Sequence, residues 1–355
     1  MRFFSIGLLA CLFAASCGQS GEPLLGDYRA IVANSLGEDI SLIHDDYSVT
    51  KSAVSVGSAP NQIILRGREA IVISSLSNSI QVIDIETWTV VREYNVGDGC
   101  NPYMGALTQD DLLVITCNQS NELILVDPDV GMEAEAVLKR MDMPAGDEMY
   151  PFEPTNPGSA RPQGVVVVGH RAYVTLANLD ASWAPAGPGL VLVVDVAAWT
   201  KDKLIQLSKT SPASVYKAGS AGEEIYVTCP GPYQFDGAGI VDVISTSNGE
   251  VDTTIEIGGA PGRMWIDGDG NAWVGDMNGG NILGFDTVSG QVVDPISLCP
   301  TQDDYLSDLA TDGRGNMFAC CFGTDAVHVF PVGNPADAEV LEVGDGPVAI
   351  LVIQR

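Results

Sequence analysis

Side chains that commonly carry out chemistry are few in this sequence, and their spacing matches no catalytic or metal-binding motif. The 355 residues include eight cysteines and three histidines, His44, His170 and His328. No two of the cysteines have the short spacing of a zinc or haem site. The chain also lacks a phosphate-binding loop and a nucleophile elbow. We therefore predict no metal and no cofactor, which leaves arginines and carboxylates as the groups that could act on a substrate.

The composition indicates which elements must position these groups. The chain has 39 glycines and 20 prolines, only 18% charged residues, and no long stretch with helical apolar periodicity. Short β-strands separated by turns are expected, in two ordinary domains or in one large all-β domain. The formal net charge of −29 opposes binding to a phosphate backbone, so nucleic acid is not expected as a partner.

A short apolar stretch recurs seven times along the chain. The copies are spaced by 40 to 59 residues and end at Asn34, Ser74, Cys117, Leu176, Cys229, Asp276 and Cys321. Each copy precedes a polar loop and a second apolar stretch, such as IQVID at 80–84. A third stretch then leads into a Gly/Pro junction, as in IEIGGAP and LEVGDGP. A period in the forties with several short strands per unit indicates a β-propeller.

With YVTL at 173–176 and YVTC at 226–229, this pattern resembles the YVTN family of β-propeller repeats over essentially all of the chain after its N-terminal segment. The resemblance implies four-stranded blades. In these, the recurring stretch is the second strand, and the junction leads into the innermost strand of the next blade. Later blades, with turns such as that at 266–276, are also similar to streptogramin lyases and related propellers. That turn lacks the terminal Glu of a calcium loop, so we expect a tight hairpin there.

The two ends of the repeat array are expected to share one blade. The first recurring stretch, residues 28–34, has no inner strand before it, and the last junction leads into VAILVI with no blade after it. We predict that residues 347–352 complete blade one, because closure hides the sheet edges that an open array would expose. The predicted fold is thus all-β, a single seven-bladed β-propeller over residues 28–355.

The N-terminal segment has the pattern of a processing signal and is set apart from the fold. An apolar run over residues 3–13 is too short to span a bilayer permanently, and small residues follow it before Cys17. Its end resembles the lipobox of bacterial lipoprotein signal peptides. The resemblance implies a signal peptide over residues 1–16, a lipid on Cys17 and a short tether over residues 17–27. Ordinary secretory cleavage with an incidental cysteine is the alternative.

Lipidation would place the protein in the cell envelope, with the membrane as a partner through the lipid. Gly18 follows the lipidated residue in place of the Asp that is associated with inner-membrane retention in some bacteria. The outer membrane is therefore the expected location, on either its periplasmic or its cell-surface side.

Propeller geometry places the junctions, and the loops after each recurring stretch, on one face, which family convention names the top face. Three insertions lengthen this face in blades three to five, the junction at 138–162 and the loops at 177–189 and 230–240. Their aromatic residues include Tyr150, Phe152, Trp183, Tyr233 and Phe235. Aromatic residues on loops held by a rigid scaffold suit a surface that binds a protein or a glycan. The alternative is that these rings only pack their own loops.

The cysteines give a second prediction about this geometry. Cys100 lies in the junction before blade three and Cys117 at the end of that blade's recurring stretch, and Cys299 and Cys321 occupy the same positions for blade seven. An exported location permits disulfides, so we predict Cys100–Cys117 and Cys299–Cys321, each adding about 3 kcal/mol of stability. Cys320 is the alternative partner for Cys299.

Catalysis has little support in the sequence. The three histidines are expected away from the top face, so the top-face histidine that the similarity to streptogramin lyases implies has no counterpart. Arg161, Arg263 and Asp308 lie near junctions and could act at the channel mouth, or the arginines could tie the strands of the channel wall together. Seven-bladed lactonases use acidic, arginine or histidine groups around this channel.

Two functions from different classes follow. We predict a non-enzymatic, envelope-anchored lipoprotein that acts as a binding or scaffold propeller. Its top-face loops, together with Arg161 and Arg263, would recognise a protein, a glycan or another envelope component. The alternative is a lyase or a lactonase-like hydrolase with acidic and arginine groups at the channel mouth. Propellers host both binding and catalysis, so the fold does not decide between these functions.

Overall fold

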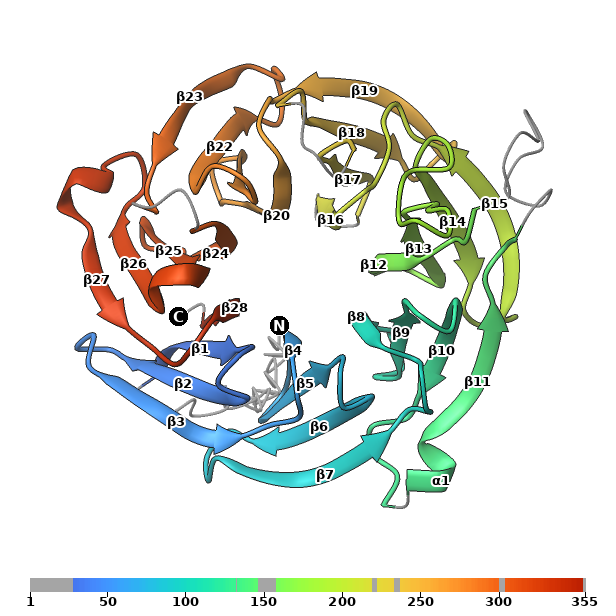
Figure 1. The fold of residues 1–355 in the computed structure, drawn as a ribbon, viewed down its shortest axis with the longest axis horizontal. Coiled ribbons are helices and arrows are strands. Elements are labelled where there is room, and N and C mark those ends of the chain that lie inside the picture. Colours follow the sequence, from blue (N-terminus) through green and yellow to red (C-terminus); the bar gives the residue numbers. More distant parts are fainter. Residues whose placement is uncertain are drawn as a thin grey trace, which may run out of the picture.

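Seven four-stranded sheets surround a central axis (Figure 1), which confirms the predicted seven-bladed β-propeller. The computed structural model describes residues 28–131, 133–145, 158–218, 222–232, 237–299 and 304–353. Short helical segments are α1 (Glu133–Ala136), η2 (Phe322–Thr324) and η3 (Pro335–Asp337). No helix in the described part of the chain is long and apolar enough to span a membrane.

Each blade has an innermost strand at the channel and a second strand that pairs with it. From blade one to blade seven, the innermost strands are β28 (Pro347–Val352), β4 (Pro60–Arg66), β8 (Pro102–Leu107), β12 (Pro162–Val168), β16 (Ser214–Ala218), β20 (Pro261–Ile266) and β24 (Leu306–Thr311). The second strands are β1 (Tyr28–Asn34), β5 (Glu69–Ser74), β9 (Leu113–Cys117), β13 (Arg171–Leu176), β17 (Glu224–Cys229), β21 (Asn271–Asp276) and β25 (Asn316–Cys321). The second strands coincide with the recurring stretch of the sequence.

The two peripheral strands complete each blade. The third strands are β2 (Asp39–His44), β6 (Ser79–Asp84), β10 (Glu122–Val126), β14 (Leu190–Asp195), β18 (Ile240–Ser245), β22 (Asn281–Asp286) and β26 (Ala326–Pro331). The outermost strands are β3 (Val49–Ser55), β7 (Thr89–Asn95), β11 (Val137–Asp142), β15 (Thr200–Gln206), β19 (Glu250–Glu256), β23 (Val292–Ser297) and β27 (Glu339–Glu342). One predicted boundary is wrong. Residues 138–142, predicted as part of the junction before blade four, form most of β11, because an outer strand that is largely exposed can carry charged residues such as Lys139, Arg140 and Asp142.

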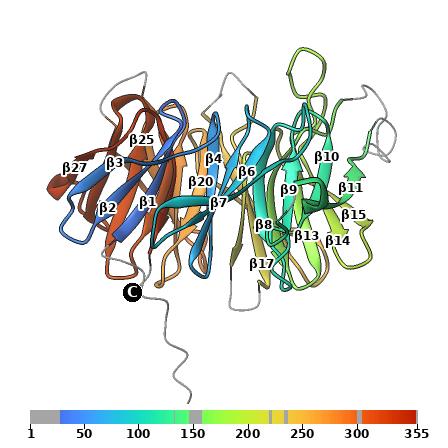
Figure 2. The same cartoon turned by 90° about the horizontal axis from the view of Figure 1, so that it is seen from below.

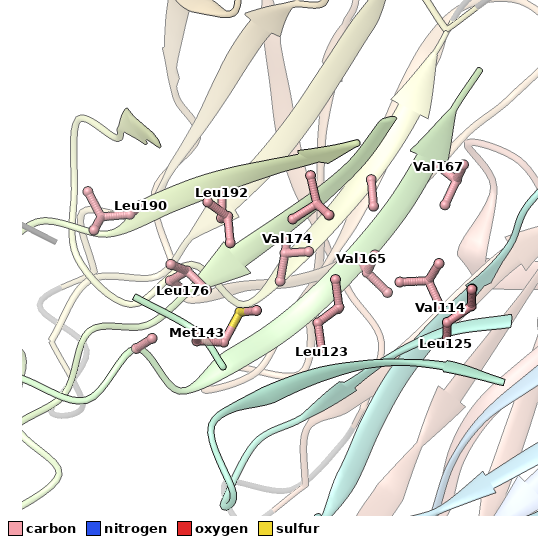
Figure 3. Close-up of a cluster of buried hydrophobic side chains, with 13 residues drawn as sticks. Val114, Leu123, Leu125, Met143, Val165, Val167, Val174, Leu176, Leu190 and Leu192 are labelled. Atoms are coloured by element: carbon pink, nitrogen blue, oxygen red, sulfur yellow. The ribbon is translucent and has the colours of Figure 1, made fainter. Parts of the chain in front are cut away.

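Burial explains why the middle strands read as continuous apolar runs. In blade two, β5 and β6 are buried almost throughout, whereas β7 is mostly exposed. A middle strand packs against a neighbouring blade on both faces, so neither face can be polar. Figure 3 shows one such interface, where Leu123 and Leu125 of blade three lie near Val165, Val174 and Leu192 of blade four.

Three copies of the recurring stretch carry a threonine, and two of these threonines join neighbouring blades. Thr116 Oγ1 donates to the carbonyl oxygen of Gln163 in the next blade (2.6 Å), and Thr228 Oγ1 donates to that of Gly262 (2.8 Å). In blade four the hydroxyl of Thr175 accepts a hydrogen bond from Gly164 N (2.8 Å) of its own inner strand. All three threonines are fully buried, so these bonds satisfy polar groups at the wall of the channel.

The ring closes as predicted, through one sheet that contains both ends of the described chain. β28 pairs antiparallel with β1, and Ala30 lies opposite Val352 while Ala33 lies opposite Ala349. Arg29 adds a link between blades one and seven, since its guanidinium lies 3.0 Å from the carboxylate of Asp312. No sheet edge therefore remains open between the first and the last blade.

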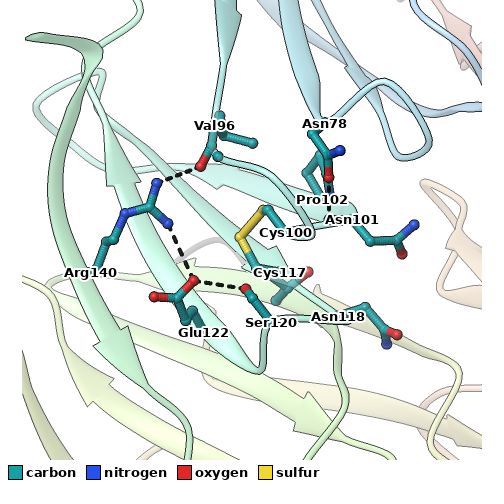
Figure 4. The surroundings of a disulfide bond; sticks show 12 residues. Asn78, Val96, Cys100, Asn101, Pro102, Cys117, Asn118, Ser120, Glu122 and Arg140 are labelled. Carbon is teal, nitrogen blue, oxygen red and sulfur yellow. Dashed lines mark hydrogen bonds and ion pairs between the residues drawn. A yellow bond between two sulfur atoms is a disulfide. The ribbon is translucent and has the colours of Figure 1, made fainter. Parts of the chain in front are cut away.

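Both predicted disulfides are confirmed. Cys100–Cys117 and Cys299–Cys321 each join a junction to the end of a second strand. Around the first disulfide, the guanidinium of Arg140 donates to the carbonyl oxygen of Val96 and lies 3.3 Å from the carboxylate of Glu122 (Figure 4). These contacts hold the outer strand of blade three against the junction that carries Cys100.

Candidate functional site

The two faces of the ring differ in what they present. Each innermost strand starts at the face that carries the junctions, and β28 ends at the opposite face, where the C-terminal end lies in Figure 2. The yellow-green loop between β13 and β14 rises from the junction face in the same view. We call the junction face the top face and the other the lower face. Because β1 starts beside the end of β28, the described chain also begins at the lower face.

A cavity of about 530 Å³ opens at the centre of the top face. All seven blades contribute to its lining. Its walls include the aromatic residues Tyr103, Trp183 and Tyr305, together with neutral polar residues such as Gln163 and Ser211. A concave site with aromatic walls and a small number of polar groups is typical of small-ligand pockets.

A local irregularity of the inner strands brings one residue to the cavity in six of the seven blades. In five blades the inner strand begins with proline, which has no N–H to give to the ladder and is tolerated as a first strand residue. The pairing register with the second strand then shifts, for example between Pro102 and Gly105 and between Pro162 and Val165. The residue directly after the first strand residue lines the cavity in six blades, at Asn61, Tyr103, Gln163, Gly262, Ser307 and Val348.

Arg263 crosses the floor of the cavity. Its Nη1 lies 3.1 Å from Asp308 Oδ2 in blade seven, and its Nη2 donates to the carbonyl oxygen of Asn61 in blade two. The same nitrogen lies 3.7 Å from the sulfur of Met104 in blade three. One guanidinium from blade six therefore contacts three other blades, as expected of a residue that ties the channel wall together.

Asp308 is the counterion of Arg263 and is saturated with hydrogen bonds. Leu309 N donates to its Oδ1 (2.9 Å) and Ile350 N to its Oδ2 (3.0 Å). Burial raises the pKa of Asp308, and Arg263 and the two N–H groups oppose that shift. All of these neighbours are donors, and none would accept a carboxyl proton. The side chain is therefore a carboxylate paired with Arg263, and this pair adds no net charge to the cavity.

Arg161 and Trp183 meet at the rim. The Arg161 guanidinium carbon lies 4.3 Å from the centre of the Trp183 ring, in a cation–π contact. The Trp183 side chain is 51% exposed and also lines the cavity. Both residues have positive φ, 49° for Arg161 and 66° for Trp183, a strained conformation for side chains of this size. Ala59 and Asn101, which precede the junction prolines of blades two and three, also have positive φ, so at Arg161 this conformation belongs to the repeated junction.

A turn built on Asp180 presents the tryptophan. Asp180 Oδ1 accepts hydrogen bonds from Ser182 N (2.8 Å), Ser182 Oγ (2.7 Å) and Ala184 N (3.1 Å). These bonds lower the pKa of Asp180, the Ser182 side chain contributing most. The backbone N–H of Trp183 donates to the Asp180 carbonyl (3.1 Å), so the ring stands at the tip of an ordered turn.

The predicted site residues have different outcomes. Arg161 and Trp183 lie together at the rim, and Arg263 lies at the floor of the same cavity. Tyr150, Phe152, Tyr233, Phe235 and the predicted lipidation residue Cys17 lie outside the described residues. The sequence predictions did not include Tyr103, Gln163, Ser211 or Tyr305. Tyr103 and Gln163 could have been found from the sequence, because each directly follows the proline of a junction.

The histidines lie away from the cavity, as predicted. His44 ends β2 and His170 lies in the turn after β12, both at the lower face. His328 lies within β26, where burial lowers its pKa. None of the three is among the residues that line the cavity in the described structure.

Among the described residues, the two free thiols and the one candidate metal cluster belong to the structure of the blades. Cys229 and Cys320 are buried in the core, and burial raises the pKa of both thiols. Cys299, Cys321 and Asp304 have possible ligand atoms within 4.8 Å of one another, but the two sulfurs form a disulfide and offer no thiolate. The Asp304 carboxylate instead accepts hydrogen bonds from Gly323 N (2.6 Å) and Thr324 Oγ1 (2.9 Å).

The hairpin predicted at 266–276 is also confirmed. Asp267 Oδ1 accepts from Asp269 N and Asn271 N, each at 2.9 Å, and its other oxygen accepts from Trp273 Nε1 (2.9 Å). The carboxylate is thus used to hold the turn between β20 and β21.

Solved structures similar to this chain share its fold and differ in function. No family model and no curated protein matches the chain. A functionally unknown protein from Desulfotomaculum acetoxidans has a TM-score of 0.68 at 11% identity, covering 92% of this chain and 99% of its own. Hydrazine synthase from Kuenenia stuttgartiensis has a TM-score of 0.65 at 17% identity, covering 83% of this chain and 95% of its own. Virginiamycin B lyase from Staphylococcus aureus has a TM-score of 0.60 at 14% identity, covering 79% and 83% respectively. At these identities the likeness shows the fold alone.

Proposed function

We propose that this protein is a non-enzymatic lipoprotein of the cell envelope, related to the YVTN-type propellers, that binds an envelope component at its top face. One observation carries the proposal. The top-face cavity of about 530 Å³ is lined by all seven blades and bordered by the half-exposed ring of Trp183 on an ordered turn. A rigid ring that converges on one concave, aromatic site has the form of a binding module.

The anchor is the second part of the proposal. Two disulfides are consistent with an oxidising, extracytoplasmic compartment. We propose that residues 1–16 are a signal peptide and that Cys17 carries the lipid that holds the protein at the outer membrane. A tether over residues 17–27 would reach β1 at the lower face, where β1 begins. The top face would then point away from the membrane.

Capture from solubilised envelopes tests the binding function. The full chain, immobilised through its C-terminal end, is compared with Trp183→Ala and with a control, Val288→Ala. Val288 is 93% exposed in the turn after β22 at the lower face. We expect a discrete envelope component on the wild type and the control, and its loss on Trp183→Ala. Equal capture by all three proteins would contradict a top-face site.

Fractionation tests the anchor separately. Wild-type protein is expected in the membrane fraction and to be released with detergent, whereas Cys17→Ser is expected in the soluble extracytoplasmic fraction. Membrane retention of Cys17→Ser with an unprocessed N-terminus would be consistent with a failed cleavage, so the mass of the N-terminal peptide is measured too. A mature wild-type chain without lipid on Cys17 would contradict lipidation.

The alternative function, a lyase or lactonase-like hydrolase, rests on Arg263 at the cavity floor. Its guanidinium contacts Asp308 and the Asn61 carbonyl, so it is occupied by structural partners. Turnover that is lost in Arg161→Ala and Arg263→Ala while thermal stability is retained would favour this alternative over binding.

A further inference from the structure

We propose that the top-face cavity binds a neutral oligosaccharide, with Trp183 as the stacking platform and with Gln163 and Ser211 as partners for its hydroxyl groups. This inference deepens the proposed binding function and rests on it. Three independent features of the described residues support it: an exposed aromatic ring held in place, polar groups with unused hydrogen-bonding capacity, and a lining without net charge.

The platform is Trp183. The guanidinium of Arg161 lies 4.3 Å from the ring centre and covers one side of it, yet the side chain is 51% exposed and lines the cavity. A pyranose ring has an apolar face of C–H bonds, which packs well against an aromatic ring. Trp183 therefore offers a flat apolar surface whose orientation is fixed before the ligand arrives, which reduces the entropic cost of binding.

Tyr103 and Tyr305 add aromatic surface to the same cavity. Tyr305 is held by a stacked contact with Phe322, their ring centroids 4.8 Å apart and their planes inclined by 19°. Burial raises the pKa of Tyr305 to about 12, so its hydroxyl is protonated at neutral pH and can both donate and accept a hydrogen bond.

The polar groups of the lining match hydroxyls rather than ions. A sugar hydroxyl both donates and accepts, and a side-chain amide offers both functions in one group. Gln163 and Ser211 line the cavity, and neither side chain has a hydrogen bond to another residue of the described part of the chain. Asn61 donates from Nδ2 to the carbonyl oxygen of Pro102 (3.3 Å), and its own side-chain oxygen is left as an acceptor among the described contacts.

Charge selects against acidic ligands. Arg263 and Asp308 form a neutral pair beneath the cavity, and the other ionisable groups of the described lining are the two tyrosines. The whole chain carries a formal charge of −29, which repels anionic sugars at a distance. Arg161 could attract a carboxylate, but its Nε is buried and its guanidinium is stacked on Trp183. An acidic sugar is therefore the competing outcome of the test.

Calorimetry on the detergent-solubilised full chain tests the proposal with four hexasaccharide probes. Three are neutral, cellohexaose, maltohexaose and chitohexaose, and one is acidic, hexagalacturonate. We expect at least one neutral probe to bind with a Kd below about 1 mM, the weak end of specific binding, and hexagalacturonate to bind at least about tenfold more weakly. Failure of all three neutral probes, or tighter binding of hexagalacturonate, would overturn the proposal.

Variants locate the bound sugar. Trp183→Ala is expected to raise the Kd of the neutral probe about tenfold, the effect of losing one aromatic stacking contact. Gln163→Ala is expected to raise this Kd about fivefold, the effect of losing one hydrogen bond. Leu76→Ala is the matched control, because Leu76 is 67% exposed in the loop after β5 on the same face and does not line the cavity. Equal affinity of Trp183→Ala and Leu76→Ala would place the sugar elsewhere and refute the platform.

The experiments distinguish an error in the carbohydrate class from an error in the binding function. If no hexasaccharide binds and Trp183→Ala still abolishes envelope capture, the top-face site remains and its carbohydrate class is wrong. If no hexasaccharide binds and Trp183→Ala captures the envelope component as well as wild type does, the proposed binding function itself is wrong.

Discussion

Replacing Asp308 with asparagine would show whether Arg263 stabilises the folded ring through its ion pair or is available to a ligand. The change keeps the shape of the side chain and an acceptor for Leu309 N or Ile350 N, but it leaves Arg263 without its counterion, 3.1 Å away. Breaking a largely buried ion pair by removing one partner costs about 3 kcal/mol or more. Unfolding entropy of about 2.1 cal/mol/K per residue over the ring amounts to about 0.7 kcal/mol/K, so Tm should fall by about 4 °C.

A double-mutant cycle measures the interaction free energy between Arg263 and Asp308 directly. Asp308→Asn, Arg263→Met and the double variant are compared with wild type by thermal unfolding at pH 7. If the two side chains stabilise each other, the double variant should lose less than the sum of the single losses, with a coupling of about 2 kcal/mol. A loss below about 0.5 kcal/mol for Asp308→Asn, or a coupling near zero, would refute the structural reading of Arg263. The guanidinium would then be available for a ligand or for catalysis.

Three further predictions concern stability. Cys100→Ser/Cys117→Ser should lower the free energy of unfolding by about 3 kcal/mol, from the chain entropy of a loop with a sequence separation of 17, and a loss below about 1 kcal/mol in denaturant would contradict this. Burial lowers the pKa of His328 below its usual 6.5, so its contribution to stability is present above that pH and is lost as pH falls through the folded-state value. The drop in Tm from pH 7.5 to 5.5 should therefore be smaller in His328→Gln than in wild type, whereas a drop in His328→Gln as large as in the exposed control His170→Gln would contradict it. Trp183→Ala should leave Tm within about 1 °C, because the ring is 51% exposed, and a larger fall would show that the ring packs its own loop.

The fold was predictable because each blade repeats the same physical problem. A middle strand buried on both faces must be apolar, and a turn must follow it, so the period appears directly in the sequence. The disulfides were predictable for the same reason, since Cys100 and Cys299 occupy equivalent junctions and their partners equivalent strand ends. Closure by residues 347–352 followed from counting strands.

The centre of the site was less predictable, because it depends on register and on distance across the ring. Arg263 contacts the Asn61 carbonyl although 202 positions separate them, and no local pattern reports such a contact. Tyr103 and Gln163 reach the cavity because the ladder shifts register after the junction proline. Most of β11 was predicted as a loop because charged residues such as Lys139 and Arg140 suit an exposed strand as well as a loop.

Site-specific photocrosslinking in intact envelopes tests the top-face binding claim most directly. A benzophenone amino acid replaces Ala184, the exposed neighbour of Trp183 at the cavity rim, or, in a matched protein, Val288 in the exposed turn of the lower face. Trp183 itself stays in place. A light-dependent adduct with an envelope component is expected from position 184 and none from position 288. No adduct from position 184, or equal adducts from both positions, would contradict a binding site on the top face.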